Sequence, residues 1–118
     1  MVSRIETNRD SLAAFRLTGT IHKSDYALLV PVLEEKINRY GKVDLYWEMV
    51  DSAGWDLEGL WEDLKFDLRH LNSFRRVAIV GDKEWEGWLA TLVKPFTTAD
   101  IRYFRVPEGD RAMGWLNT

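Results

Sequence analysis

Strand-like and helix-like segments alternate strictly along this chain after a first pair of strands, and this alternation constrains the fold more than any other feature. Residues 74–80 (FRRVAIV) form a nearly continuous apolar run, which is typical of a strand buried on both faces of a parallel sheet. Neighbouring parallel strands need crossover connections, usually helices. The pattern therefore predicts an α/β fold, with a mixed, mostly parallel sheet and flanking helices.

The predicted element order is β-β-α-β-α-β-α-β-α. Strands are expected at residues 2–8, 14–21, 43–50, 74–80 and 100–106. Helices are expected at residues 24–40, 56–71 and 83–93 and from Pro107 onward. A turn at residues 8–11 makes the first two strands a hairpin. Gly41 is expected to end the first helix, and Pro31 to kink or divide it.

Composition indicates one globular domain over residues 1–118, with 46% hydrophobic and 30% charged residues. The absence of cysteine excludes disulfides, thiolate catalysis and cysteine-based zinc sites. The only histidines, His22 and His70, are far apart, so we expect no metal site and no cofactor.

The net charge of −3 argues against nucleic acid as a partner. The basic pairs Arg75-Arg76 and Arg102/Arg105 are interpreted as ordinary solvated positions. The N-terminus has no apolar leader and no apolar run is long enough to span a membrane, so we expect a soluble, cytoplasmic protein.

Three large apolar residues fall outside the core stripes of the first two predicted helices. On a helical wheel the first helix has a core stripe of Tyr26, Leu29, Val30, Leu33, Ile37 and Tyr40. Leu28 and Val32 lie off that stripe, one turn apart, and Phe66 lies opposite the stripe of the second helix. They are either scattered exposed residues or the lining of a groove for a partner helix or an apolar ligand.

Tryptophan is abundant, with six residues in 118. Trp85 and Trp88 share the core face of the third predicted helix, whereas Trp55 precedes the second and is least explained by packing. The loops at residues 51–55 and 81–85 follow strands, at the edge of an α/β sheet where ligands bind. An aromatic-walled pocket between them is therefore a second hypothesis.

Motifs for catalysis are missing. Ser52 has no histidine partner and does not lie in a nucleophile elbow. Glu48 could form an acid–base pair with Asp51, but a carboxylate among apolar strand neighbours is better interpreted as a hydrogen-bonded structural acid. The sequence therefore predicts a protein that is not an enzyme.

Several segments together resemble the SpoIIAA-like family of small bacterial proteins. They are Gly19-Thr20-Ile21 with Asp25, Leu33–Ile37, Asp51–Trp55, Leu60–Lys65, Val77–Trp85, Pro95-Phe96 and Ala112–Leu116. The resemblance implies the fold of STAS domains (sulfate transporter and anti-sigma factor antagonist), with helices on one side of a mixed sheet. That fold is also compared with lipid-carrying CRAL-TRIO domains, which suggests an apolar or lipid-like ligand.

The resemblance also implies an alternative, a regulatory protein-interaction domain. Anti-sigma antagonists carry a phosphorylatable Ser or Thr directly before the glycine that starts the helix after the third strand. The matching residue here is Ala53, and Ser52 lies one position earlier. A phosphate at Ser52 would meet the helix dipole and change a binding surface.

We therefore expect a non-enzymatic binding module, with Leu28, Val32, Trp55, Phe66, Trp85 and Trp88 as ligand or partner contacts. Ser52 is the candidate phosphorylation site. Exposed apolar residues also make a homodimer an expectation.

Overall fold

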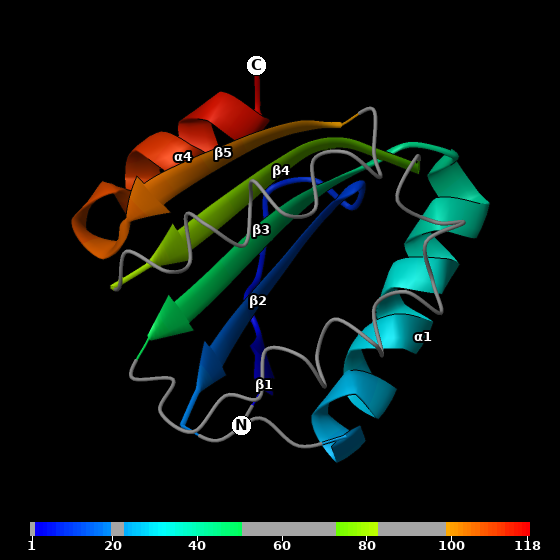
Figure 1. Ribbon diagram of the computed structural model, residues 1–118. Coiled ribbons are helices and arrows are strands. Elements are labelled where there is room, and N and C mark those ends of the chain that lie inside the picture. The colour runs from blue at the N-terminus through cyan, green and yellow to red at the C-terminus, as the bar shows by residue number, and fades with distance from the viewer. Residues whose placement is uncertain (1, 20–22, 51–72, 83–98) are drawn as a thin grey trace.

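Five strands form one sheet in the computed structural model, which describes residues 2–19, 23–50, 73–82 and 99–118 (Figure 1). The strands lie in sequence order, β1-β2-β3-β4-β5. They are β1 (Val2–Arg4), β2 (Leu12–Thr18), β3 (Val43–Val50), β4 (Phe74–Gly81) and β5 (Asp100–Arg105). β1 runs antiparallel to β2, and the other three pairings are parallel. The predicted mixed, mostly parallel sheet is confirmed.

The first two strands have other bounds than the sequence predicts, because their partners set their lengths. β2 pairs with β3 along its whole length, from Leu12 to Thr18. After β1, one more ladder bond joins the Ile5 amide to the Ala14 carbonyl at 2.9 Å. The Thr7 hydroxyl then bonds the Arg9 carbonyl at 2.7 Å, which turns the chain before a longer strand can form.

The helix α1 (Lys23–Tyr40) is a single helix that includes Pro31. It ends as predicted at Gly41, whose φ of +77° favours glycine and whose amide bonds the Ile37 carbonyl at 2.8 Å. The predicted C-terminal helix opens as a 3-10 turn, η3 (Val106–Glu108), and continues as α4 (Gly109–Leu116). The helices predicted at residues 56–71 and 83–93 lie outside the described residues.

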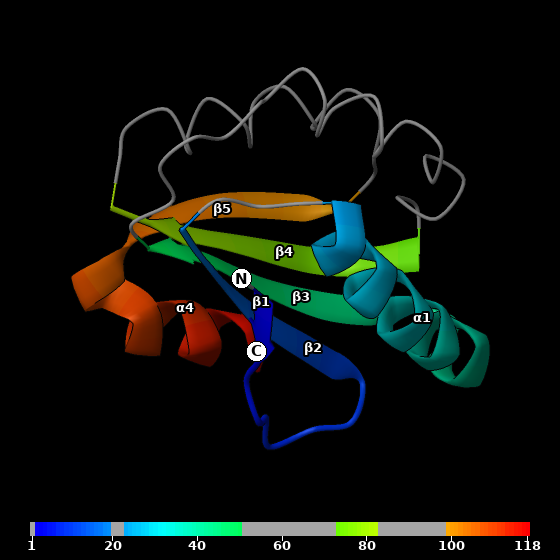
Figure 2. The same ribbon diagram turned by 90° about the horizontal axis from the view of Figure 1, so that it is seen from below.

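Alternate strand residues point to opposite faces of the sheet and build two separate cores. The core on the α1 face contains Phe15, Leu17, Leu29, Leu45, Met49 and Ile79. The core on the α4 face contains Leu12, Ala14, Tyr46, Ala78, Val80, Ala112 and Leu116. Figure 2 shows α4 beneath the sheet, away from α1. The expectation of helices on one side only is therefore wrong for α4, which packs on β3 and β4 and contributes Ala112 and Leu116 to the same core as Ala78.

The core stripe of α1 differs from the predicted one because it contains a lysine. Lys36 is 6% exposed, and its ammonium group bonds the Asp10 carbonyl at 2.5 Å. The buried face of α1 therefore includes Lys36 and the position four residues before it, Val32. Val32 is partly buried and packs against the α1-face core. The prediction that Val32 lies off the core is therefore wrong. Tyr40, predicted to be in the core, is 44% exposed.

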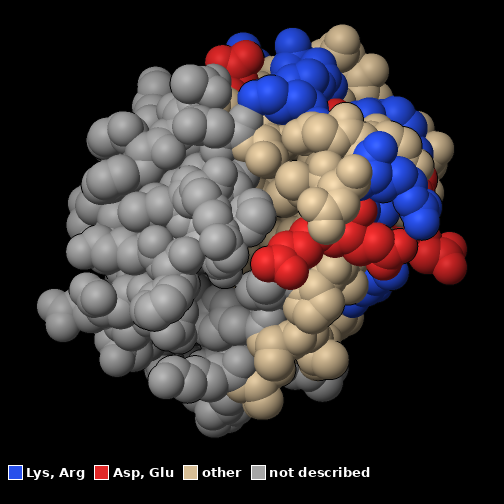
Figure 3. All heavy atoms as spheres, turned by 90° about the vertical axis from the view of Figure 1, so that its right-hand side faces the viewer, with Lys and Arg blue, Asp and Glu red and all other residues tan. Residues whose placement is uncertain are grey.

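Asp10 attaches the loop between β1 and β2 to the last turns of α1. Its carboxylate accepts hydrogen bonds from Tyr40 at 2.5 Å, Lys36 at 3.2 Å and Arg39 at 3.0 Å. These bonds, with that of Tyr40 the largest cause, lower the pKa of Asp10 to about 2. Arg39 also pairs with Glu35 at 3.2 Å. Figure 3 shows acidic and basic atoms together on this side of the molecule.

A lowered pKa predicts a pH-dependent contribution of Asp10 to stability. Because the folded-state pKa lies below the ordinary value of 3.8, the contribution is present above about pH 4 and is lost as the pH falls toward 2. Asp10→Asn should lower the urea midpoint at pH 7, and its difference from the wild type should shrink toward zero near pH 2. Glu35→Gln, at the exposed pair, is the control and should change the midpoint less. A difference for Asp10→Asn that stays constant between pH 7 and pH 2 would contradict this account.

Candidate functional site

The structure describes two of the six predicted contact residues. Leu28 is 64% exposed, in agreement with its place off the core stripe. Val32, as described above, is part of the packing between α1 and the sheet. The other predicted contacts, Trp55, Phe66, Trp85 and Trp88, lie outside the described residues, as do Ser52 and Ala53.

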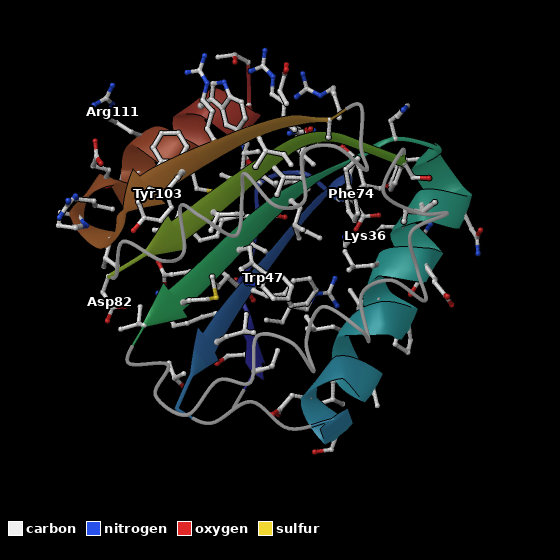
Figure 4. All side chains as sticks on the ribbon, viewed as in Figure 1. Lys36, Trp47, Phe74, Asp82, Tyr103 and Arg111 are labelled. Atoms are coloured by element: carbon white, nitrogen blue, oxygen red, sulfur yellow. The ribbon has the colours of Figure 1, made fainter. Side chains whose placement is uncertain are left out.

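Trp47 is a further candidate on the α1 face. It lies in the middle of β3, between Phe15 of β2 and Ile79 of β4, and its partly buried ring packs against the α1-face core (Figure 4). Within the described part of the chain, its indole Nε1 is the one buried side-chain nitrogen or oxygen without a hydrogen-bond partner. An unpaired buried donor costs free energy, so a group that accepts a hydrogen bond from this N–H would lower that cost.

Glu48, the neighbour of Trp47, points to the opposite face and is 5% exposed. Its carboxylate accepts a hydrogen bond from Tyr46 Oη at 2.8 Å and another from Arg16 Nε, which is directly across the strand pair. Burial and the bond to Glu48 raise the pKa of Tyr46, and the Glu48 bond raises the pKa of Arg16. Glu48 is thus a hydrogen-bonded acid, in agreement with its interpretation from the sequence as a structural residue.

A buried carboxylate also holds the carboxyl end of α4. Asp44 is 2% exposed and accepts hydrogen bonds from Arg9 at 2.6 Å and from Arg75 at 2.9 Å. Both guanidinium groups also bond the Leu116 carbonyl at 2.9 Å. The arginines therefore neutralise Asp44 and satisfy a carbonyl at the negative end of the helix.

A β-bulge directs two consecutive arginines to α4. Between the pairs Val43–Phe74 and Leu45–Val77, β4 has one residue more than β3. Both Arg75 and Arg76 therefore reach α4. Arg76 bonds the Trp115 carbonyl at 2.7 Å, and its guanidinium lies 5.1 Å from the Trp115 ring centre, while that of Arg102 lies 5.0 Å from it. The interpretation as ordinary solvated positions is wrong for Arg76, which is partly buried, whereas Arg75 and Arg102 are exposed as expected and also contact α4. Arg105 is exposed.

Comparison with known proteins decides the family. The family model described as SpoIIAA-like matches residues 12–117. The chain belongs to the SpoIIAA-like family.

A solved structure agrees with this assignment. It is the crystal structure of an uncharacterized protein of the DUF3478 family, with a SpoIIAA-like fold, from Shewanella loihica PV-4. The TM-score is 0.75 at 26% sequence identity, over 98% of this chain and 92% of that one. Among curated proteins none matches.

The sequence interpretation of this SpoIIAA-like domain missed Arg16, Tyr46 and Trp47. The sequence did contain a signal for Arg16. Arg16 and Glu48 are charged residues within two largely apolar strands, and they are direct partners across this strand pair. Trp47 has no such signal, since only the three-dimensional packing shows that its N–H is unpaired.

Among the described residues of this SpoIIAA-like domain, no group of three or more His, Cys, Asp or Glu residues could hold a metal ion. No helix there is long and apolar enough to cross a membrane.

The two glycines of α4 provide a test of how closely this helix approaches Tyr46. A Cβ added to Gly109 would lie 2.9 Å from Tyr46 Oη, whereas one added to Gly114 would meet nothing within 4 Å. Alanine at Gly114 should stabilise the protein by about 0.5–1 kcal/mol through helix propensity. Gly109→Ala should instead destabilise it, and Tyr46→Phe in the same chain should remove most of that penalty. Urea unfolding measures all three changes, and equal effects of alanine at both glycines would contradict the close contact.

Proposed function

We propose that this SpoIIAA-like domain is a non-enzymatic binding module that holds an apolar or lipid-like small molecule on the α1 face of its sheet. The observation that carries the proposal is the buried, unpaired N–H of Trp47 within an apolar layer. A fatty acid or similar molecule has a carbonyl or carboxylate oxygen that can accept this hydrogen bond. Its chain would replace water along the apolar side chains.

The surroundings of Trp47 support an apolar ligand. Partly buried residues from α1 and the sheet pack against the same core, among them Val32, Ile37 and Val77. Leu28, four residues before Val32 on α1, extends this apolar surface outward. Trp55, Phe66, Trp85 and Trp88 are proposed to complete the lining together with Leu28 and Val32.

The proposal is tested with oleate and the purified protein. The wild type should bind oleate, as followed by isothermal titration calorimetry. Trp47→Phe keeps an apolar ring but removes the donor, so it should weaken binding several-fold, as expected for the loss of about 1 kcal/mol. Trp115→Phe, on the α4 face, is the matched control and should leave the affinity unchanged.

A charge on α1 tests the same surface independently. Leu28→Asp should weaken oleate binding, because it places a carboxylate beside the apolar chain. Asn38→Asp adds the same charge at another exposed position of α1 and should have little effect. Failure of the wild type to bind oleate, with no lipid found by native mass spectrometry of the purified protein, would overturn the proposal.

The second candidate is a regulatory protein-interaction domain of the anti-sigma antagonist type. It is favoured by family membership and by the end of β3 at Val50, two residues before Ser52. Ala53 occupies the usual phosphorylated position, so any switch would act through Ser52. Phosphate found on this loop in the wild type but not in Ser52→Ala would favour this candidate over the binding module.

A further inference from the structure

The α4 face of the sheet has a pocket beside the Arg16–Glu48 pair. It has a volume of about 570 Å³ and lies between the ends of β2 and β3 and the amino end of the η3–α4 segment. Its lining includes Ile5, Arg16, Glu48, Val50, Gly109 and Met113. Because Glu48 and Trp47 are consecutive in β3, this pocket is on the face opposite to the proposed lipid site.

We propose that this pocket binds a small carboxylate with an apolar body. The carboxylate group would bond the guanidinium of Arg16, and the body would lie against Ile5, Val50 and Met113.

Arg16 is held in position for such a ligand. Its Nε is bonded to Glu48, which is itself fixed by Tyr46 Oη at 2.8 Å. Its terminal Nη atoms have no bonding partner among the described residues, and the side chain is 53% exposed. A guanidinium fixed through Nε presents its two outer nitrogens as a planar fork, the geometry that matches a carboxylate.

The charges around the Arg16 guanidinium act in opposite directions on a bound anion. The amino end of the η3–α4 segment lines the pocket and carries the positive end of the helix dipole. Glu48 already compensates the charge of Arg16, and Asp110 adds an exposed negative charge to the lining. Asp110 should therefore weaken anion binding, which gives the proposal a signed test.

The remaining lining is suited to hydrocarbon. Ile5, Val106 and Met113 are partly buried and pack against the α4-face core, and Pro107 and Val50 extend the same wall. An apolar body placed there is removed from water, while only the carboxylate needs polar partners.

The experiment compares three probes that share one chain, octanoate, 1-octanol and octylammonium, in NMR titrations of the folded wild type. Octanoate should bind most tightly and shift the amide signals of Val50, Gly109 and Asp110. Arg16→Gln should weaken octanoate binding at least about tenfold, and Arg16→Lys should weaken it less because it retains the charge. Arg111→Gln, an arginine of α4 outside the pocket lining, is the control and should change nothing.

Asp110→Asn tests whether the pocket prefers an anionic ligand, and it changes no buried residue. It should tighten octanoate binding about two- to fivefold, because it removes an opposing exposed charge. Tighter binding of octylammonium than of octanoate, weaker octanoate binding by Asp110→Asn, or unchanged binding by Arg16→Gln would each overturn the proposal. Octanoate shifts confined to Trp47 and α1 would also overturn it, while leaving the lipid site on the other face supported.

Discussion

A buried aspartate, Asp44, determines how the last helix is attached to the sheet. A carboxylate that is almost fully buried must have cationic or hydrogen-bonding partners, because burial of an unpaired charge is very costly. Arg9 and Arg75 meet this requirement from opposite sides of β3 and at the same time bond the Leu116 carbonyl. The interaction that neutralises Asp44 is therefore also the one that fixes the carboxyl end of α4.

The position of α4 in turn divides the molecule into two chemically different halves. Its apolar residues cover β3 and β4, and its amino end leaves a pocket over Arg16. On the other face, α1 covers a layer that is almost wholly apolar around Trp47. Trp47 and Glu48, which are consecutive in β3, lie on these two faces, because a strand directs alternate side chains to opposite sides.

The sequence predicts the fold well because strand and helix patterns are local. The strand predicted at residues 43–50 has the observed bounds of β3, and the glycine after Tyr40 ends α1 as expected. The errors come from polar residues whose role depends on distant partners. Lys36 belongs to the core stripe of α1 only because Asp10 supplies two acceptors from a turn 26 residues away. Arg75 and Arg76 contact α4 only because a bulge in β4 directs both toward it, and a bulge has no signal in this segment.

The candidate sites are less predictable from sequence than the fold. The Arg16–Glu48 pair could have been found from matching polar positions in two apolar strands, but the hollow above it depends on where α4 begins. The unpaired N–H of Trp47 is invisible in the sequence, because any tryptophan in a strand looks the same there.

Native-state amide hydrogen exchange of Asp44→Asn tests most directly whether this aspartate holds α4. The substitution leaves two arginines facing each other without their shared counter-charge. We predict that the amides of α4 then exchange through a local opening, while those of β2 and β3 still require global unfolding. Protection that falls equally in α4 and in the sheet, or stays unchanged in α4, would contradict the account.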